Sequence, residues 1–185
     1  MYNKLIDKYY EDGPLKTILL QHSKAVAEKA IAIAEANPQI SINREFVYEA
    51  AMLHDIGIIR CDAPGIECFG TEHSIRHGII GAQMLRQDAS SFGMTEEQIE
   101  PYARVCERHT GAGLTAKEIR EQGLPLPEVD LLPETTEEKL VCYADKFFSK
   151  TRPTQEKPLE RVMKSMEKFG ADTVARFQEL HNIFE

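Results

Sequence analysis

Histidine and aspartate, two residue types that bind metal ions, recur in this sequence at positions that face the interior of predicted helices. His22 lies four residues after Ile18 and four before Val26, so it shares one helical face with two apolar side chains. Asp145 follows Val141 at the same interval. The same reading of helical spacing selects six residues in all: His22, His54, Asp55, His77, His109 and Asp145.

The burial of these six side chains has two explanations. A single inward histidine is most often a core residue whose hydrogen bonds are satisfied, and each histidine taken alone allows that explanation. Six separate burials are costly, however, because removing an ionised carboxylate from water costs several kcal/mol or forces its protonation. A shared cation removes this cost, since it neutralises the carboxylates and binds the imidazole lone pairs. Together the six residues therefore favour a metal centre.

The adjacent pair His54-Asp55 predicts a particular local geometry. Neighbours on a helix are separated by about 100°, so both side chains reach one ion only near a helix end. Gly57, two residues later, indicates such an end. Asp55 can then bridge two metal ions with its two oxygens. Nitrogen and oxygen ligands without cysteine suit iron, manganese, cobalt, nickel or zinc, and six ligands suit two ions roughly 3.5–4 Å apart better than one.

The remaining histidines and the cysteines give weaker indications of metal binding. His73 lies one turn before His77 on the same face, so it is expected to line the same cavity without binding metal. His181, near the end of the chain, is expected at the surface or in packing. None of the four cysteines forms a C-x-x-C pair, which argues against a zinc ribbon. Cys106 and Cys142 fall in apolar helical contexts, which predicts core packing.

Helical periodicity and capping signals predict an all-α fold. Thr95 followed by Gln98, and Thr115 followed by Glu118, are capping-box signatures. No alternating run of strand length and no internal repeat is present. We expect a loop at 59–71 and an extended stretch at 124–133. The predicted helices cover residues 15–36, 43–57, 73–87, 95–109, 115–123, 135–148, 158–170 and a last stretch that ends near Phe184.

Composition places the chain among globular proteins. It has 185 residues, 42% hydrophobic residues and a net charge of −8, which suits one domain. The negative charge argues against a nucleic-acid polymer or an anionic membrane as partner, but a local basic cluster or a metal still allows a small anionic substrate. No apolar run is long enough for a transmembrane helix, and the first residues lack the apolar core of a signal peptide, so a cytoplasmic location is expected.

The sequence resembles the HD-domain superfamily of metal-dependent phosphohydrolases. The doublet for which that superfamily is named is His54-Asp55 in AAMLHDIGI, and the HDIG form is intact at residues 54–57. The first family histidine matches His22 in QHSKAVA, and the last aspartate matches Asp145 in CYADKF. His77 in EHSIRHGIIGA and His109 in CERHTGAGLTAKEI resemble the members that hold two metals.

The likeness is greatest to a small group of uncharacterised HDIG proteins of archaea and bacteria, around residues 109–115 and 133–145. It covers residues 15–150. Residues 151–185 are expected to form a C-terminal helical extension packed on the same domain. The apolar last helix could instead pack on a second copy, which leaves a homo-oligomer possible.

The resemblance implies hydrolysis of a phosphoester in a nucleotide or another small phosphorylated metabolite. It assigns His22, His54, Asp55 and Asp145 to a first divalent ion, and His77, His109 and the second oxygen of Asp55 to another. Iron is the first expectation, with manganese, nickel, cobalt, zinc or magnesium as alternatives. Asp55 and Asp145 are the expected catalytic residues, with Asp145 also orienting the attacking water. Arg60, His73 and Lys146 are the candidates to bind the substrate phosphate, with Arg108 a weaker one.

Two other functions fit the same residues. Some two-metal HD proteins resemble oxygenases with a di-iron pair, and their six ligands follow the same order, so the ligands alone do not separate them from hydrolases. A non-catalytic module that binds a nucleotide is the third hypothesis. All six ligand positions are filled, which counts against it. The insertion-like segment CDAPGIECFG could be either a lid over the site or a passive surface loop.

Overall fold

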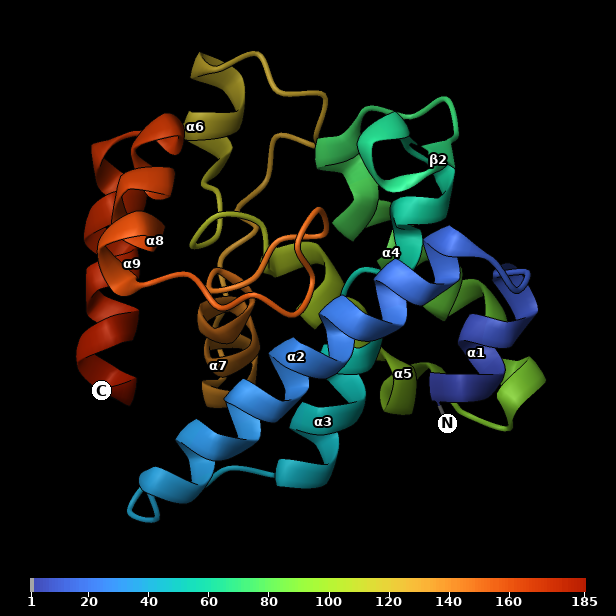
Figure 1. The fold of residues 1–185 in the computed structure, drawn as a ribbon, viewed down its shortest axis with the longest axis horizontal. Coiled ribbons are helices and arrows are strands. Elements are labelled where there is room, and N and C mark those ends of the chain that lie inside the picture. Colours follow the sequence, from blue (N-terminus) through green and yellow to red (C-terminus); the bar gives the residue numbers. More distant parts are fainter. Residues whose placement is uncertain (1) are drawn as a thin grey trace.

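The computed structural model describes residues 2–185, which fold into helices arranged around the long helix α2 (Figure 1). The all-α prediction is confirmed. The α-helices are α1 (Tyr2–Tyr9), α2 (Pro14–Ala36), α3 (Arg44–Leu53), α4 (His77–Asp88), α5 (Glu96–Arg108), α6 (Ala116–Glu121), α7 (Thr136–Asp145), α8 (Leu159–Met166) and α9 (Ala171–Phe184).

Short elements join these helices. Within residues 2–185 they are five 3₁₀ turns and, between η1 and α4, one antiparallel hairpin of two-residue strands in which Asp62 pairs with Phe69. In order they are η1 (Ile56–Arg60), β1 (Asp62–Ala63), η2 (Pro64–Ile66), β2 (Cys68–Phe69), η3 (Ser74–Arg76), η4 (Ala89–Phe92) and η5 (Glu167–Phe169).

Side-chain caps fix where several helices begin. Asn43 accepts a hydrogen bond from the Phe46 backbone nitrogen at 3.1 Å and so starts α3. The capping boxes that begin at Thr95 and Thr115 are both formed, which confirms the predicted starts of α5 and α6. The Thr135 side chain caps α7 by accepting a hydrogen bond from the Glu138 backbone nitrogen at 3.1 Å. These bonds satisfy donors that a free helix end would leave unpaired.

The structure differs from the sequence prediction at several places, one of which is α8, which ends at Met166 and not at residue 170. Helix α1 was not predicted; its buried residues are Leu5 and Ile6. Helix α3 ends at Leu53 and not at Gly57, so the His54-Asp55 pair lies in the turn that follows. Helix α7 ends at Asp145 and does not continue to residue 148. The expected loop at 59–71 contains the short hairpin, and α4 begins at residue 77 because His73 caps a separate 3₁₀ turn before it.

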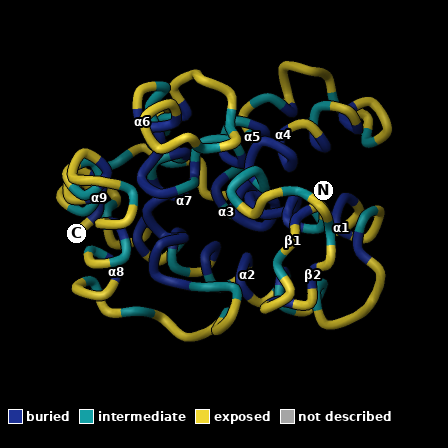
Figure 2. Tube along the Cα trace, turned by 90° about the horizontal axis from the view of Figure 1, so that it is seen from above, coloured by how far each residue is buried: buried dark blue, intermediate teal, exposed yellow. Residues whose placement is uncertain are grey.

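Within residues 2–185 two large apolar clusters meet along α2, and a smaller third one lies around Leu114 and Ile119. The first cluster joins the second half of α2 to α3, α7, α8 and α9, while the second joins α1, the start of α2, the hairpin, α4 and α5. Leu19 belongs to the second cluster and Val26 to the first, so His22 lies where they meet. Figure 2 shows the buried residues concentrated where α2, α3, α5 and α7 come together.

The C-terminal helices pack on the rest of the chain through aromatic side chains. Phe177 of α9 stacks on Tyr143 of α7 with ring centroids 5.3 Å apart, and Phe184 lies 5.7 Å from the same ring. In Figure 1, α8 and α9 lie at the opposite end of the molecule from α1 and the hairpin. The division of the chain at residue 150 stays a prediction. No helix among residues 2–185 has the length and apolarity needed to cross a bilayer.

Candidate metal centre

The six inward histidines and aspartates converge on one place. His22 comes from the middle of α2, His54 and Asp55 from the turn after α3, and the others from the ends of three more helices. His77 is the first residue of α4, His109 follows the last residue of α5, and Asp145 is the last residue of α7. Their ligand atoms form two groups: His22, His54, Asp55 and Asp145, and Asp55, His77 and His109.

Asp55 belongs to both groups because each of its oxygens faces a different pair of histidines. Its Oδ2 lies 3.1 Å from Nε2 of His22 and 3.2 Å from Nε2 of His54. Its Oδ1 lies 3.1 Å from Nε2 of His77 and 3.4 Å from Nε2 of His109. The Asp55 side chain is fully buried. This arrangement is the one that a carboxylate bridging two ions requires.

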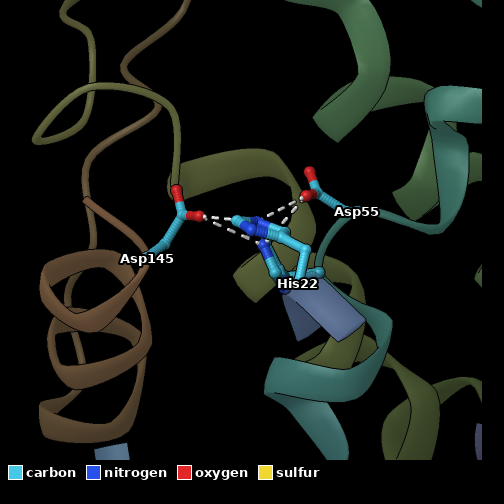
Figure 3. Close-up of side chains that lie close together, drawn as sticks. His22, Asp55 and Asp145 are labelled. Carbon is cyan, nitrogen blue, oxygen red and sulfur yellow. Dashed lines mark hydrogen bonds and ion pairs between the residues drawn. The ribbon is translucent and has the colours of Figure 1, made fainter. Parts of the chain in front are cut away.

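Asp145 completes the first group from the opposite side. Its Oδ1 lies 3.0 Å from Nε2 of His22 and 3.4 Å from Nε2 of His54. Figure 3 shows the His22 ring between the carboxylates of Asp55 and Asp145, which approach it from different elements. Three residues far apart in the sequence therefore present one nitrogen and two oxygens to a common point.

Hydrogen bonds to the backbone fix the tautomer of three histidines. The Nδ1 atoms of His54, His77 and His109 lie 2.6, 2.7 and 2.8 Å from carbonyl oxygens of residues 51, 74 and 106. A ring nitrogen that faces a carbonyl must donate, so in each neutral ring the Nε2 atom carries a lone pair directed into the centre. Such second hydrogen bonds are typical of histidines that bind metal.

In the described part of the chain, several ligand atoms of the centre lack a hydrogen-bond donor of good geometry. Nε2 of His77 and Nε2 of His109 lie 2.9 Å apart, and two lone pairs at that distance repel unless a cation or a proton lies between them. Among the described residues, Nε2 of His54 and both oxygens of Asp55 are buried without a hydrogen bond of good geometry, although Lys150 forms an ion pair with Oδ2 of Asp55 at 2.7 Å. Buried polar atoms are costly to leave unpaired. A divalent cation in each group satisfies all of them, so the residues present fit a metal pair.

Electrostatics keeps the acidic ligands ionised. Burial opposes the charge of Asp55, but His54 and Lys150 with hydrogen bonds from the histidines outweigh it and hold the pKa of Asp55 well below its ordinary value. Burial likewise opposes the charge of Asp145, and Lys146 with His22 and His54 holds the pKa of Asp145 well below its ordinary range. Ionised carboxylates are the form that binds metal.

The pKa values of His109 and His54 shift in opposite directions. Burial lowers the pKa of His109 to about 3, so its ring is neutral and able to bind an ion. Burial also acts to lower the pKa of His54, but the carboxylates of Asp55 and Asp145 raise it to about 10. A divalent cation would replace that proton between the same carboxylates.

The centre opens into a cavity of about 550 Å³, here called the centre cavity. Its lining includes His22, His77, His109 and Asp145 together with Lys146, Lys150, Lys157 and Lys168. A mostly apolar cavity of about 580 Å³ adjoins it and shares His77 with it. Ala63, Gly65 and Ile66 of the hairpin segment line this second cavity, so the segment whose role was open forms a wall beside the centre.

The predicted phosphate-binding residues lie at different places. Lys146 lines the centre cavity, with its Nζ atom 2.6 Å from Oδ2 of Asp145. His73 lines the adjoining apolar cavity, and its Nδ1 accepts a hydrogen bond from the Ile75 backbone. Arg60 is exposed, its charge acts on the phenol of Tyr9, and it does not line the centre cavity.

The guanidinium of Arg108 lies 3.0 Å from Glu134 and 3.1 Å from the Leu132 carbonyl, and Arg108 does not line the centre cavity. His181 was expected at the surface or in packing. It takes part in packing, because its Nδ1 lies 2.9 Å from the hydroxyl of Tyr143.

Three lysines of the centre cavity were missed by the sequence analysis. Lys150 contacts Oδ2 of Asp55 at 2.7 Å, and Lys157 and Lys168 line the cavity from the C-terminal segment. Lys150 lies one turn after Lys146, a spacing that could have suggested it. Nothing in the local sequence indicates that Lys157 or Lys168 faces the centre.

The amino-acid sequence of this chain is similar to one protein family and to several known proteins. The HD domain family model matches residues 19–150. An uncharacterised protein of Methanocaldococcus jannaschii is 36% identical over 152 residues, which are 81% of this chain and 76% of that protein. Two tRNA (cytidine(56)-2′-O)-methyltransferases, from Picrophilus torridus and Thermoplasma volcanium, are each 32% identical over 165 and 178 residues, or 89% and 95% of this chain.

The matched regions make up 40% and 44% of those two methyltransferases, so the chain spans less than half of their length. No solved structure matches the chain.

Proposed function

Because this chain belongs to the HD domain family, we propose that it is a metal-dependent phosphohydrolase that acts on a nucleotide or another small phosphorylated metabolite. One observation carries the proposal: two groups of ligand atoms share the buried carboxylate of Asp55 and open into a cavity lined by lysines. Metal ligands beside basic side chains are what a phosphate ester needs for binding.

A bound pair of divalent ions would supply a water of lowered pKa and positive charge close to the phosphate oxygens. The residues of the chain have separate tasks. Asp145 directs Oδ1 to the histidines of the first group, while its Oδ2 lies against Lys146 at the edge of the cavity. That second oxygen can accept a hydrogen bond from a water and orient it toward a phosphorus atom.

Lys146 and Lys150 offset the negative charge of the carboxylates Asp145 and Asp55. Each holds an ammonium within 2.7 Å of a carboxylate of the centre, and both line the cavity. When a phosphate enters, these ammonium groups can donate hydrogen bonds to its oxygens and stabilise negative charge that develops there. The proposal takes a small phosphorylated molecule as the partner, without a nucleic-acid polymer or a membrane, and places it in the cytoplasm.

The proposal is tested by metal analysis of protein purified without added metal, followed by a phosphatase screen over nucleotides and sugar phosphates. We expect about two ions per chain, with iron first, and phosphate release from at least one class of substrate. Loss of phosphatase activity on chelation, and its return on adding iron or manganese, would support the metal requirement. Metal-replete protein that releases no phosphate from any of them would contradict the proposal.

The same ligand set also permits a di-iron oxygenase. Six nitrogen and oxygen ligands with a shared carboxylate are compatible with both activities. An assay of iron-loaded protein under oxygen with candidate alcohols and phosphonates separates them. Oxygen uptake coupled to substrate loss, without phosphate release from any phosphoester, would favour the oxygenase.

The methyltransferase names of two relatives do not enter this proposal. Those names describe proteins more than twice as long as the segment that matches this chain. The proposal rests instead on the buried histidines and aspartates that this chain itself carries.

A further inference from the structure

The charges that line the centre cavity differ from those of the whole chain. The sequence has 30 acidic and 22 basic residues, yet the cavity lining holds Lys146, Lys150, Lys157 and Lys168 against one carboxylate, that of Asp145. A cavity walled by one sign of charge concentrates ligands of the opposite sign. The lining is therefore arranged for an anion.

Two of the four lysines are already paired with carboxylates of the centre. Lys146 lies 2.6 Å from Asp145, and Lys150 lies 2.7 Å from Asp55. The two acidic residues of the centre are thus each matched by one ammonium. Any further positive charge on the cavity wall is in excess, even before metal ions add theirs.

Lys157 and Lys168 supply that excess. Within residues 2–185 neither side chain forms an ion pair with a carboxylate; Lys168 lies at the exposed rim with its ammonium 4.7 Å from the centroid of the Phe169 ring. Lys157 is half-buried. Burial, with the charges of Lys146 and Lys168, lowers the pKa of Lys157 against the opposing effect of Asp145. An unpaired ammonium in that position is unfavourable until an anion joins it.

Both lysines come from a segment beyond the family match, which ends at residue 150. Lys157 precedes α8, and Lys168 lies in η5 directly after it. Val162 and Met166 of α8 are buried in the first apolar cluster, which holds this segment in place against the rest of the fold. The C-terminal segment therefore adds a fixed part to the wall of the cavity.

We propose that Lys157 and Lys168 form a second anion subsite that binds a second phosphoryl group of the substrate. The inference rests on the proposed function: one phosphoryl group lies at the centre with Lys146 and Lys150, and the other at this subsite. A cavity of about 550 Å³ lies in the size range of small-molecule sites. The net charge of −8 favours a small bisphosphorylated metabolite over a nucleic-acid strand.

Binding to a matched pair of probes tests this subsite. Adenosine 5′-monophosphate and adenosine 3′,5′-bisphosphate are titrated by calorimetry into chelator-treated full-length protein, where turnover does not interfere. We expect the bisphosphate to bind about ten-fold more tightly or better, the gain typical of added charge-assisted hydrogen bonds. Lys157→Gln and Lys168→Gln should each reduce that preference and leave monophosphate affinity within about two-fold.

Lys164→Gln is the control, because Lys164 is exposed on α8 and does not line the centre cavity. Thermal melting shows whether each variant is folded. Equal binding of the two probes by the wild type would overturn the subsite. So would an equal loss of affinity for both probes in Lys157→Gln, or a short RNA strand that competes better than the bisphosphate.

Phosphate release is measured separately, so the two proposals can fail independently. Bisphosphate preference without any phosphatase activity leaves the subsite standing and contradicts the hydrolase. Hydrolysis of monophosphates with no bisphosphate preference leaves the hydrolase standing and contradicts the subsite.

Discussion

At the scale of single residues, the centre depends most on Asp55. Its carboxylate is common to both ligand groups, one oxygen facing each group, and among the described residues only Oδ2 has a lysine partner, the ammonium of Lys150 at 2.7 Å. The histidines differ, because each contributes one nitrogen to one group. Removing the shared carboxylate should therefore affect both ions, while removing a histidine from the second group should affect one.

We expect Asp55→Ala to abolish metal binding and activity together, since both groups lose an anionic ligand. Elemental analysis of the purified variant beside the wild type measures this. Asp62→Ala, an exposed aspartate seven residues later, is the control and should keep its metal. Full metal occupancy in Asp55→Ala would contradict the bridging role.

His77→Ala and His109→Ala should each lower the metal content from about two ions to about one. The reason is that these two rings, with Oδ1 of Asp55, make up the second group alone. Metal is counted per chain after gel filtration. His73→Ala serves as the control, since His73 is exposed and lies outside both groups. If both variants keep the wild-type count, the second site is misassigned.

At the scale of elements, the ends of helices place the ligands. His77 begins α4, His109 follows α5 and Asp145 ends α7, so their side chains project from points where the backbone changes direction. A close approach at Gly57 holds α4 in position: a Cβ atom there would lie 2.1 Å from the carbonyl oxygen of His77 and 2.3 Å from the nitrogen of Gly81. Only glycine leaves room for this contact.

We expect Gly57→Ala to lower the free energy of unfolding by about 3 kcal/mol and to weaken metal binding, because α4 must move away with His77. Urea unfolding and metal analysis measure the two effects. Gly65→Ala is the matched control, since nothing lies within 4 Å of a Cβ at that position. An unchanged unfolding midpoint in Gly57→Ala would contradict the close approach.

At the scale of the whole molecule, two apolar clusters meet at the centre and the C-terminal helices close one side. Besides its aromatic contacts, α9 is tied to α6 by Arg176, whose Nη2 lies 2.8 Å from Oε2 of Glu118 and 3.0 Å from the Gly113 carbonyl. Glu118 is buried, so this pair is partly shielded from water. This ion pair fixes α9, against which α8 and η5, the turn that contains Lys168, pack.

We expect Glu118→Gln to lower the free energy of unfolding at neutral pH by about 2 kcal/mol, since it leaves Arg176 without its carboxylate. Burial opposes the charge of Glu118, but bonds from Thr115 and Arg176 outweigh it and lower the pKa of Glu118 below its ordinary 4.5. The contribution of the pair to stability is therefore complete above pH 4.5 and is lost as the pH falls through the folded-state pKa.

Urea unfolding at pH 7 and at several values below pH 4.5 measures this difference between wild type and variant. The difference in unfolding free energy between the wild type and Glu118→Gln should disappear in acid. Glu121→Gln, an exposed glutamate of the same helix, should show no such gap at any pH. A gap that persists unchanged in acid would mean that the charge of Glu118 is not its source.

Local patterns in the chain were enough to predict most of the helices and the residues that face inward. Caps at Asn43, Thr95 and Thr115 and the helical spacing are local properties, because they depend on hydrogen bonds and side-chain directions within a few residues. The same spacing identified all six candidate ligands, and the HDIG motif identified the family. Their role as ligands stays a prediction; their convergence is what the structure adds.

Only the tertiary structure decided which side chains share the centre and its cavity. Lys157 and Lys168 came to the cavity wall, Arg60 did not, and Gly57 proved to be a packing contact and not a helix stop. These outcomes depend on how α4, α7 and α8 pack against α2, α3 and α5. Such packing is set by apolar contacts between residues distant in sequence, so no local pattern contains it.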